Sequence, residues 1–313
     1  MLGHLCTNRK AWFAVVGETS SICMIIPWFG PWPPWIRPFL ESCRWNPTVD
    51  WLLYGDAPPP SDLPSNVRIV TTTLDDYRAE ASSRLGIRLA WMNTYKLCDL
   101  KPALGFIHEQ EITGYDHWGF GDLDVIYGDI RRFFTPSVLN HDLVTTHEHI
   151  VAGHFSVLRT TPRMLTAFKR VPDWKLLLSS TRHRSFDEQI FSHLFLRTHR
   201  GRVWRRFITP YLGGGYFQEA FSTNISDILK WIDGGSEFPR HWYWDRGHLT
   251  TDRSGDREFL YLHFSHWQSN RWTNQPTAPW KSLDRLVDLP DGRPSGFTIS
   301  AKGFTPLPQP AIA

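Results

Sequence analysis

Three short apolar segments near the N-terminus, residues 21–26, 49–54 and 67–70, constrain the fold more than any other feature of this sequence. Each has the length and the nearly unbroken hydrophobicity of a strand that is buried on both faces. Segments with helical signals follow them, among them residues 74–85, which stop at Gly86. This alternation of strands and helices predicts an α/β protein with a mostly parallel central sheet and helices on both of its faces.

The length of the chain bounds how this core is divided. With 313 residues and no internal repeat, the sequence is long enough for one large α/β domain. We predict an N-terminal extension over residues 1–20, a single domain over 21–270 and a Pro-rich tail over 271–313. Residues 199–257 are rich in Gly, Arg and Trp without a clear pattern, so the C-terminal part of the domain is expected to be irregular.

Charge and cysteine content exclude several classes of protein. A net charge of +3 is too small a bias for a nucleic-acid-binding protein, although it is compatible with a phosphate-bearing ligand. The four cysteines form no C-x-x-C pair, which argues against a zinc site and for a reducing compartment. No apolar run reaches transmembrane length, and no signal peptide is evident. We expect a cytoplasmic protein, with peripheral association at the inner face of the membrane left open.

The central candidate for a functional site is the sequence Gly121-Asp122-Leu123-Asp124, which lies between two apolar segments. Aspartate disfavours strand and helix interiors, so the pair marks the end of a strand. With one residue between them, both carboxylates are expected to point to the same side. Paired carboxylates of this kind suit Mg²⁺ or Mn²⁺, and such a cation can hold a diphosphate. The alternative is that Asp122 forms a turn and Asp124 a helix cap, both solvated.

Other polar side chains are expected near the same edge of the sheet. Trp28 and Asp56 directly follow two of the predicted strands, and ligands of parallel sheets collect at the carboxyl ends of strands. A helix is predicted over residues 95–110, and it carries Asp99 and Lys101. Trp28 and Asp56 would thus converge with the Asp122/Asp124 pair at one edge of the sheet.

Six motifs follow one another along the chain: Ile25-Ile26-Pro27-Trp28-Phe29-Gly30, Tyr95-Lys96-Leu97-Cys98-Asp99-Leu100-Lys101-Pro102, Gly119-Phe120-Gly121-Asp122-Leu123-Asp124, Gly153-His154-Phe155-Ser156, Phe186-Asp187-Glu188 and Tyr261-Leu262-His263-Phe264. Taken in this order, they resemble a family of bacterial sugar-transferase-like proteins with the GT-A glycosyltransferase fold, linked to capsule or lipopolysaccharide synthesis. The resemblance covers residues 21–270.

The resemblance implies a metal and nucleotide site. Asp122, Asp124 and His263 would bind Mn²⁺ or Mg²⁺, with Asp122 also reaching the donor. The alternative for His263 is an ordinary core histidine, and His266 lies close enough in sequence to replace it. Further contacts with the nucleotide sugar would come from the strand ends and from the helix before the acidic pair, namely Pro27, Trp28, Asp56, Asp99 and Lys101.

The resemblance also implies catalytic and acceptor residues. Asp187 and Glu188 would supply the base of an inverting enzyme, and His154 would contact the acceptor. Each has a structural alternative. Ser185 and Glu188 have the spacing of a capping box, so the acidic pair could serve only the start of a helix. His154 could be an interior histidine, and Lys101 a solvated helix residue.

The function expected from these residues is metal-dependent transfer of a sugar from a nucleotide-sugar donor, UDP-linked in the first instance, to a glycan or other hydroxyl acceptor in surface polysaccharide synthesis. Two other classes compete with it. One is a metal-dependent phosphoester hydrolase, which also uses paired carboxylates. The other is a non-catalytic carbohydrate-binding protein, because the chain contains 16 Trp residues and sugar rings stack on such side chains.

Overall fold

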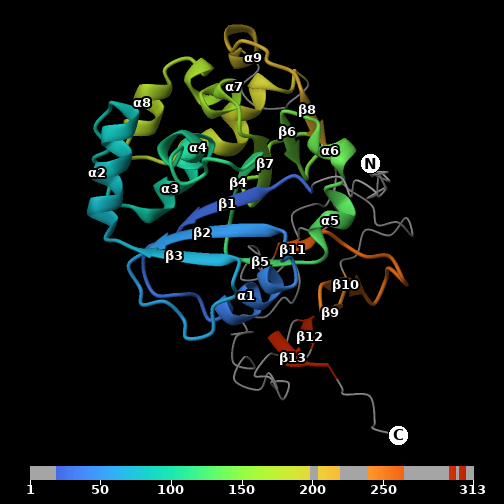
Figure 1. Cartoon of the computed structure of the whole chain (residues 1–313). Helices are drawn as coiled ribbons and strands as arrows, with labels where there is room; N and C mark the ends of the chain where they lie inside the picture. Colours follow the sequence, from blue (N-terminus) through green and yellow to red (C-terminus); the bar gives the residue numbers. More distant parts are fainter. Residues whose placement is uncertain (1–18, 198–203, 219–238, 264–295, 301–302, 308–313) are drawn as a thin grey trace, which may run out of the picture.

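The computed structural model describes residues 19–197, 204–218, 239–263, 296–300 and 303–307. A seven-stranded sheet with the strand order β3-β2-β1-β4-β7-β6-β8 lies at its centre (Figure 1). The pairs β1–β2, β1–β4, β2–β3 and β6–β8 are parallel, whereas β4–β7 and β6–β7 are antiparallel. The strands are β1 (Ile22–Pro27), β2 (Val49–Gly55), β3 (Val67–Thr71), β4 (His117–Gly121), β6 (Leu143–Thr145), β7 (Phe155–Arg159) and β8 (Gly215–Phe217). The predicted α/β class with a mostly parallel sheet is therefore confirmed.

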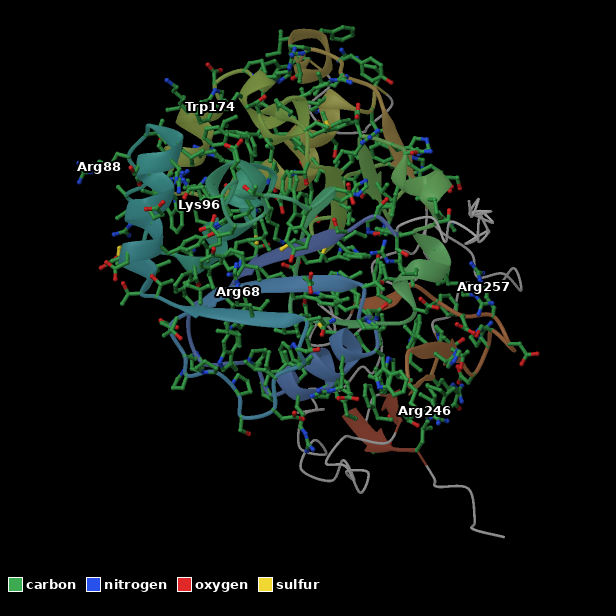
Figure 2. The ribbon with its side chains drawn as sticks, viewed as in Figure 1. Arg68, Arg88, Lys96, Trp174, Arg246 and Arg257 are labelled. Atoms are coloured by element: carbon green, nitrogen blue, oxygen red, sulfur yellow. The ribbon has the colours of Figure 1, made fainter. Side chains whose placement is uncertain are left out.

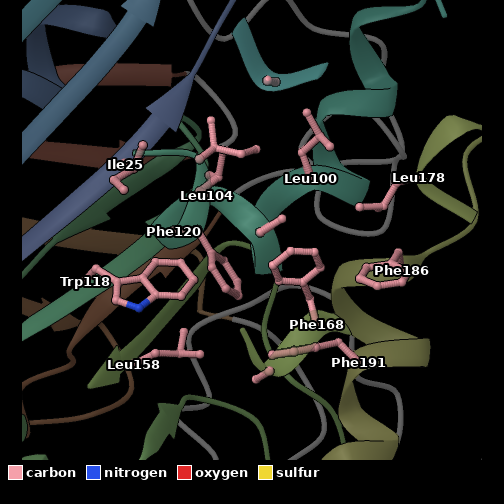
Figure 3. Packing of buried hydrophobic residues seen from close by; sticks show 14 of the residues in the cluster. Ile25, Leu100, Leu104, Trp118, Phe120, Leu158, Phe168, Leu178, Phe186 and Phe191 are labelled. Atoms are coloured by element: carbon pink, nitrogen blue, oxygen red, sulfur yellow. The ribbon is translucent and has the colours of Figure 1, made fainter. Parts of the chain in front are cut away.

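Helices cover both faces of this sheet, which explains why its central strand β1 is apolar at consecutive positions. In β1, Ile22 and Met24 face the side covered by α1 (Ile36–Arg44), whereas Cys23 and Ile25 face the side of α2 (Leu74–Leu85) and α4 (Leu104–Ile107). Figure 3 shows the packing on this second side, where Leu100 and Leu104 lie near Trp118 and Phe120 of β4. Burial of both faces leaves the ends of the strands as the places where polar side chains collect.

The remaining helices are short. The predicted helix over 95–110 is divided into separate turns, because Pro102 has no N–H for the helical ladder and the chain takes up 3₁₀ geometry around it. The short helices are η1 (Thr94–Lys96), α3 (Leu97–Leu100), η2 (Lys101–Ala103), α5 (Ile130–Phe133), α6 (Pro136–Leu139), α7 (Pro162–Leu165), η3 (Ala167–Arg170), α8 (Trp174–Ser179), the single π-helical turn η4 (Phe186–Ile190), η5 (Phe191–Leu194) and α9 (Arg205–Ile208).

The C-terminal part is more regular than the sequence suggested. Strands β9 (His241–Asp245), β10 (His248–Thr251), β12 (Phe297–Ser300) and β13 (Gly303–Pro306) form a four-stranded antiparallel sheet in the order β10-β9-β12-β13. Its buried side chains, Trp242, Trp244, Phe297, Ile299 and Phe304, alternate along the strands and form a core of their own, against which Trp35 and Trp45 pack. The sequence placed both β12 and β13 in a tail, but β12 pairs with β9 and β13 pairs with β12.

The other parts of the predicted division lie largely outside the described residues. These are residues 1–18 of the predicted extension, residues 271–295 of the predicted tail, and His266. The boundaries of the single domain stay a prediction. Among the described helices, none combines the length and the hydrophobicity that crossing a membrane requires.

Candidate functional site

Asp122 and Asp124 lie in the turn between β4 and a short strand, β5 (Val125–Tyr127). Between them, Leu123 is buried in the core, so the two carboxylates project to the opposite side of the turn. The side chain of Asp122 is 33% exposed and that of Asp124 is 25% exposed. Two hydrogen bonds hold the turn, from the Asp122 amide to the carbonyl of His154 (3.2 Å) and from the Trp35 indole to the carbonyl of Leu123 (2.8 Å). The sequence predicted this arrangement, with both carboxylates at a strand end.

His263 reaches the acidic pair through a strand that is distant in sequence. β11 (Tyr261–His263) pairs antiparallel with β5, and this register sets His263 opposite Val125. The Nε2 atom of His263 lies 3.5 Å from Oδ1 of Asp124. Ligand-capable atoms of Asp122, Asp124 and His263 all lie within 4.8 Å of one another. The structure therefore brings together the three residues that the sequence assigned to a metal.

The chemistry of this donor set fits the expected cation. Two carboxylates and one imidazole suit Mn²⁺, and carboxylates with water also suit Mg²⁺. Within the described residues, Nδ1 of His263 is buried and has no hydrogen-bond partner. Burial alone would raise the pKa of Asp124, but His263 outweighs it and the pKa is lowered, so this carboxylate is ionised and able to ligate. For Asp122, burial prevails over the attraction of Lys101, and the pKa is raised.

Lys101 contacts two acidic segments, the turn after β4 that carries Asp122 and a second segment that carries Asp187. Its Nζ atom lies 2.6 Å from Oδ1 of Asp122 and 3.9 Å from Oδ2 of Asp187. Burial disfavours the charged form of Lys101, but Asp122 and neighbouring anionic groups outweigh this and raise its pKa well above the usual range. Lys101 is thus a buried ammonium group rather than the solvated helix residue of the alternative interpretation.

Asp187 and Glu188 lie on η4 and rest against Gly153. The Gly153 amide donates to Oε1 of Glu188 (3.2 Å). A Cβ atom at position 153 would lie 2.8 Å from Oδ2 of Asp187 and 2.9 Å from Oε1 of Glu188, so glycine is what lets the carboxylates approach this loop. Burial raises the pKa of Asp187 well above its usual value, against the opposing effect of Lys101. A raised pKa is a property of carboxyl groups that exchange protons near neutral pH.

The predicted capping box at the start of this segment is absent. Ser185 has a left-handed backbone with φ of 50°, and its side chain makes no capping hydrogen bond. Instead of an α-helical start, the chain forms the single π-helical turn η4, a geometry that is rare and often found at functional sites. Glu188 is therefore not held as the second member of a capping box.

Asp99 is not a partner of Lys101. It is fully buried and forms an ion pair with Lys96, whose Nζ atom lies 2.5 Å from Oδ2 of Asp99. Figure 2 places Lys96 inside the helical layer, whereas the labelled Arg88 points outward. This role of Lys96 was not predicted, although the spacing of three residues between Lys96 and Asp99 on a helical segment is a signal for an ion pair.

His154 lies beneath His263 and not at an open surface. Its ring stacks on that of His263 with a centroid distance of 4.0 Å, and its Nε2 atom lies 2.7 Å from the Tyr261 hydroxyl. The Tyr261 hydroxyl in turn donates to Oγ1 of Thr146 (2.7 Å). Burial, with the charge of His263, lowers the pKa of His154 well below its usual value. These contacts favour the interior-histidine interpretation over contact with an acceptor.

Pro27, Trp28 and Asp56 lie at the carboxyl ends of β1 and β2. Since β1 lies between β2 and β4, these ends share the sheet edge from which Asp122 projects. Oδ1 of Asp56 accepts a hydrogen bond from the Gly30 amide (2.7 Å), and the Trp28 indole donates to the carbonyl of Pro31 (3.0 Å). Both side chains therefore order the loop after β1.

Fold and site together define a mixed α/β protein with a carboxylate–histidine cluster at the carboxyl ends of its parallel strands. The chain belongs to the family of unknown function DUF6625, whose sequence pattern matches residues 24–285. No curated protein matches the sequence.

Among solved structures, the chain is similar to glycosyltransferases at low identity. The glycosyltransferase GlyE of Streptococcus pneumoniae TIGR4 matches with 11% identity and a TM-score of 0.36, over 58% of this chain and 45% of that one. The apo form of GlyE matches with 12% identity and a TM-score of 0.37, over 58% and 44% of the two chains. Mouse xyloside xylosyltransferase 1 matches with 12% identity and a TM-score of 0.29, over 52% and 72%. The chain thus spans less than half of GlyE.

Proposed function

We propose that this protein is a metal-dependent glycosyltransferase that moves a sugar from a UDP-linked donor to a hydroxyl group of a glycan. The observation that carries the proposal is the convergence of Asp122, Asp124 and His263 at the carboxyl ends of parallel strands. Three ligands from two distant segments form a compact donor set there. When bound, a divalent cation such as Mn²⁺ would neutralise the diphosphate as it leaves the sugar.

In this proposal the residues of the chain divide the remaining tasks. Asp124 and His263 would hold the cation, and Asp122, which the Lys101 ammonium group keeps in place, would share it. Pro27, Trp28 and Asp56 form the loop that would receive the base and ribose of the nucleotide.

The acidic pair would handle the proton. Nζ of Lys101 lies 2.6 Å from Asp122 of the donor site and 3.9 Å from Asp187. The donor site and the acidic pair Asp187-Glu188 are therefore neighbours. Asp187 or Glu188 accepts the proton of the attacking hydroxyl if the anomeric configuration is inverted.

A thermal-shift panel of UDP, GDP, CMP and dTDP, each with and without Mn²⁺, tests the function. We expect UDP to raise the melting temperature only when Mn²⁺ is present, because a ligand that binds the folded state stabilises it. UDP release from one sugar donor should then follow. A shift from glycans that is indifferent to EDTA, with no UDP shift, would support a carbohydrate-binding protein. Metal-dependent cleavage of phosphoesters without sugar transfer would support a hydrolase.

We further propose that the protein works on polysaccharide precursors at the cytoplasmic face of the membrane. Support comes from a surface formed by exposed apolar side chains around α9. Its members are Trp204, Phe207, Ile208 and Tyr211. Arg197 lies over the ring of Tyr211 at 5.0 Å. The sequence from 189 to 218 contains no Asp or Glu, and its arginines are Arg197, Arg200, Arg202, Arg205 and Arg206. Aromatic side chains combined with basic charge suit an anionic lipid surface.

The membrane proposal predicts that Phe207→Ser weakens binding to vesicles of phosphatidylcholine with phosphatidylglycerol by about tenfold, the cost of losing the burial of one large apolar side chain. Leu176→Ser is the matched control, because Leu176 is 70% exposed and Phe207 75% exposed, yet Leu176 lies on α8. Co-sedimentation with the vesicles measures both. Equal binding of the two variants, or a dimer of the wild type that Phe207→Ser dissociates, would contradict membrane association.

A further inference from the structure

We infer that Asp99 is a positioning residue. It holds the turn formed by residues 184–188, so that Asp187 and Glu188 face the donor site. The inference rests on the proposed function for what the turn does, and on direct contacts for how the turn is held. Asp99 was expected from the sequence to touch the donor. Its complete burial and its hydrogen-bond partners assign it this different task.

Both oxygens of Asp99 accept hydrogen bonds from the backbone of the turn. Oδ2 accepts from the Arg184 amide and Oδ1 from the Phe186 amide, each at 2.8 Å. These amides flank Ser185, the residue with φ of 50°. A non-glycine residue in the left-handed region is strained and persists only where its surroundings enforce that conformation. The two hydrogen bonds of Asp99 provide that enforcement on both sides of Ser185.

Lys96 is what allows a carboxylate to be buried at this position. Its Nζ atom is 2.5 Å from Oδ2 of Asp99 and donates a second hydrogen bond to the carbonyl of Leu177 (2.8 Å). His183 adds a ring nitrogen 3.4 Å from Oδ1 of Asp99. An unpaired buried carboxylate would be costly, so the Lys96–Asp99 pair acts as one unit.

The opposite side of the turn is also enclosed. The Ser192 hydroxyl donates to the carbonyl of Glu188 and accepts from the Val151 amide (2.8 Å). Gly153 contacts both carboxylates, as described above. Between Asp99 and the loop 151–153, the turn sets Oδ2 of Asp187 3.9 Å from Nζ of Lys101. A shift of the turn would therefore change the position of Asp187 relative to Lys101, without touching Asp124 or His263.

The experiment compares Asp99→Asn with Glu41→Gln in the full-length chain. Glu41 is a matched control because it is also a buried carboxylate in an ion pair, 2.9 Å from Arg44 on α1, and it takes no part in the proposed site. Asparagine at position 99 has one acceptor oxygen, so it can replace only one of the two carboxylate oxygens that accept from the Arg184 and Phe186 amides. Three quantities are measured: UDP binding with Mn²⁺, kcat and KM for transfer, and hydrogen exchange of the amides of Arg184 and Phe186.

For Asp99→Asn we expect UDP binding and donor KM to change by less than about threefold, and kcat to fall by about tenfold or more, because small misplacements of reacting groups are costly. Hydrogen exchange of the Arg184 and Phe186 amides should accelerate at least about tenfold, because losing a hydrogen bond removes about 1.4 kcal/mol of local stability, which corresponds to a factor of ten. Glu41→Gln should change neither. Equal kcat and exchange in both variants would overturn the inference and leave the proposed function intact. If the wild type transfers no sugar, the proposed function fails, and unchanged exchange in Asp99→Asn would separately reject the positioning role.

Discussion

Replacing Asp124 with asparagine should abolish Mn²⁺-dependent UDP binding while leaving the fold intact. Asp124 faces His263 at 3.5 Å, and its pKa is lowered, so it contributes an ionised oxygen to the donor set. An amide of the same shape cannot supply that charge. Substitution of a residue that hydrogen-bonds to a metal ligand typically costs about 10–100-fold in metal affinity. Loss of the ligand itself should therefore weaken Mn²⁺ binding by about 100-fold or more.

Asp129→Asn is the matched control for this substitution. Asp129 lies five residues further along the chain and caps α5 by accepting from the Arg131 amide (3.0 Å), a role that asparagine also fills. Mn²⁺ titration by electron paramagnetic resonance, followed by UDP calorimetry, measures both variants. Wild-type affinity in Asp124→Asn would remove Asp124 from the metal site, and with it the main support for sugar transfer.

The second large effect is expected on stability. In Lys101→Met, Asp122 and Asp187 would lose the ammonium group that lies 2.6 Å and 3.9 Å from them. Removing one partner of a buried ion pair typically destabilises by about 3–5 kcal/mol. We expect a loss of about 3 kcal/mol in the free energy of unfolding, at the low end of that range because the Asp122 side chain is 33% exposed.

Urea denaturation measures this loss, and a second substitution reveals its cause. The double variant Lys101→Met with Asp187→Asn should recover part of the lost stability, because it removes a carboxylate whose charged form is disfavoured by burial. Lys175→Met is the control for the loss of a lysine charge, since Lys175 is exposed on α8 and should cost less than about 0.5 kcal/mol. A loss no greater than that in Lys101→Met would show that the ammonium group does not hold the acidic segments together.

The central sheet and the acidic pair could be predicted because their signals are local. Buried strands such as 49–54 show as apolar runs, and the turn after β4 shows as two carboxylates after an apolar segment. The meeting of His263 with Asp124 depends on the β5–β11 ladder, which joins segments more than a hundred residues apart. No periodicity encodes that pairing, and only the resemblance to sugar transferases suggested it.

Other features were missed because they depend on partners that the sequence does not place. Asp99 was assigned to the nucleotide sugar, whereas the helical backbone presents it to Lys96. The left-handed conformation of Ser185 follows from hydrogen bonds to Asp99 and not from its own side chain. The strands β12 and β13 were hidden by the prolines around them, although Phe297 and Ile299 alternate as a half-buried strand requires.

The pairing of β11 with β5 also sets an order of events during synthesis. A nascent chain that ends before residue 261 contains all the strands of the central sheet and both aspartates, but lacks His263. The ribosome must therefore synthesise most of the chain before His263 can meet Asp124. Chains cut short upstream of Tyr261 would lack His263 beside Asp124, and β5 would lack its partner strand.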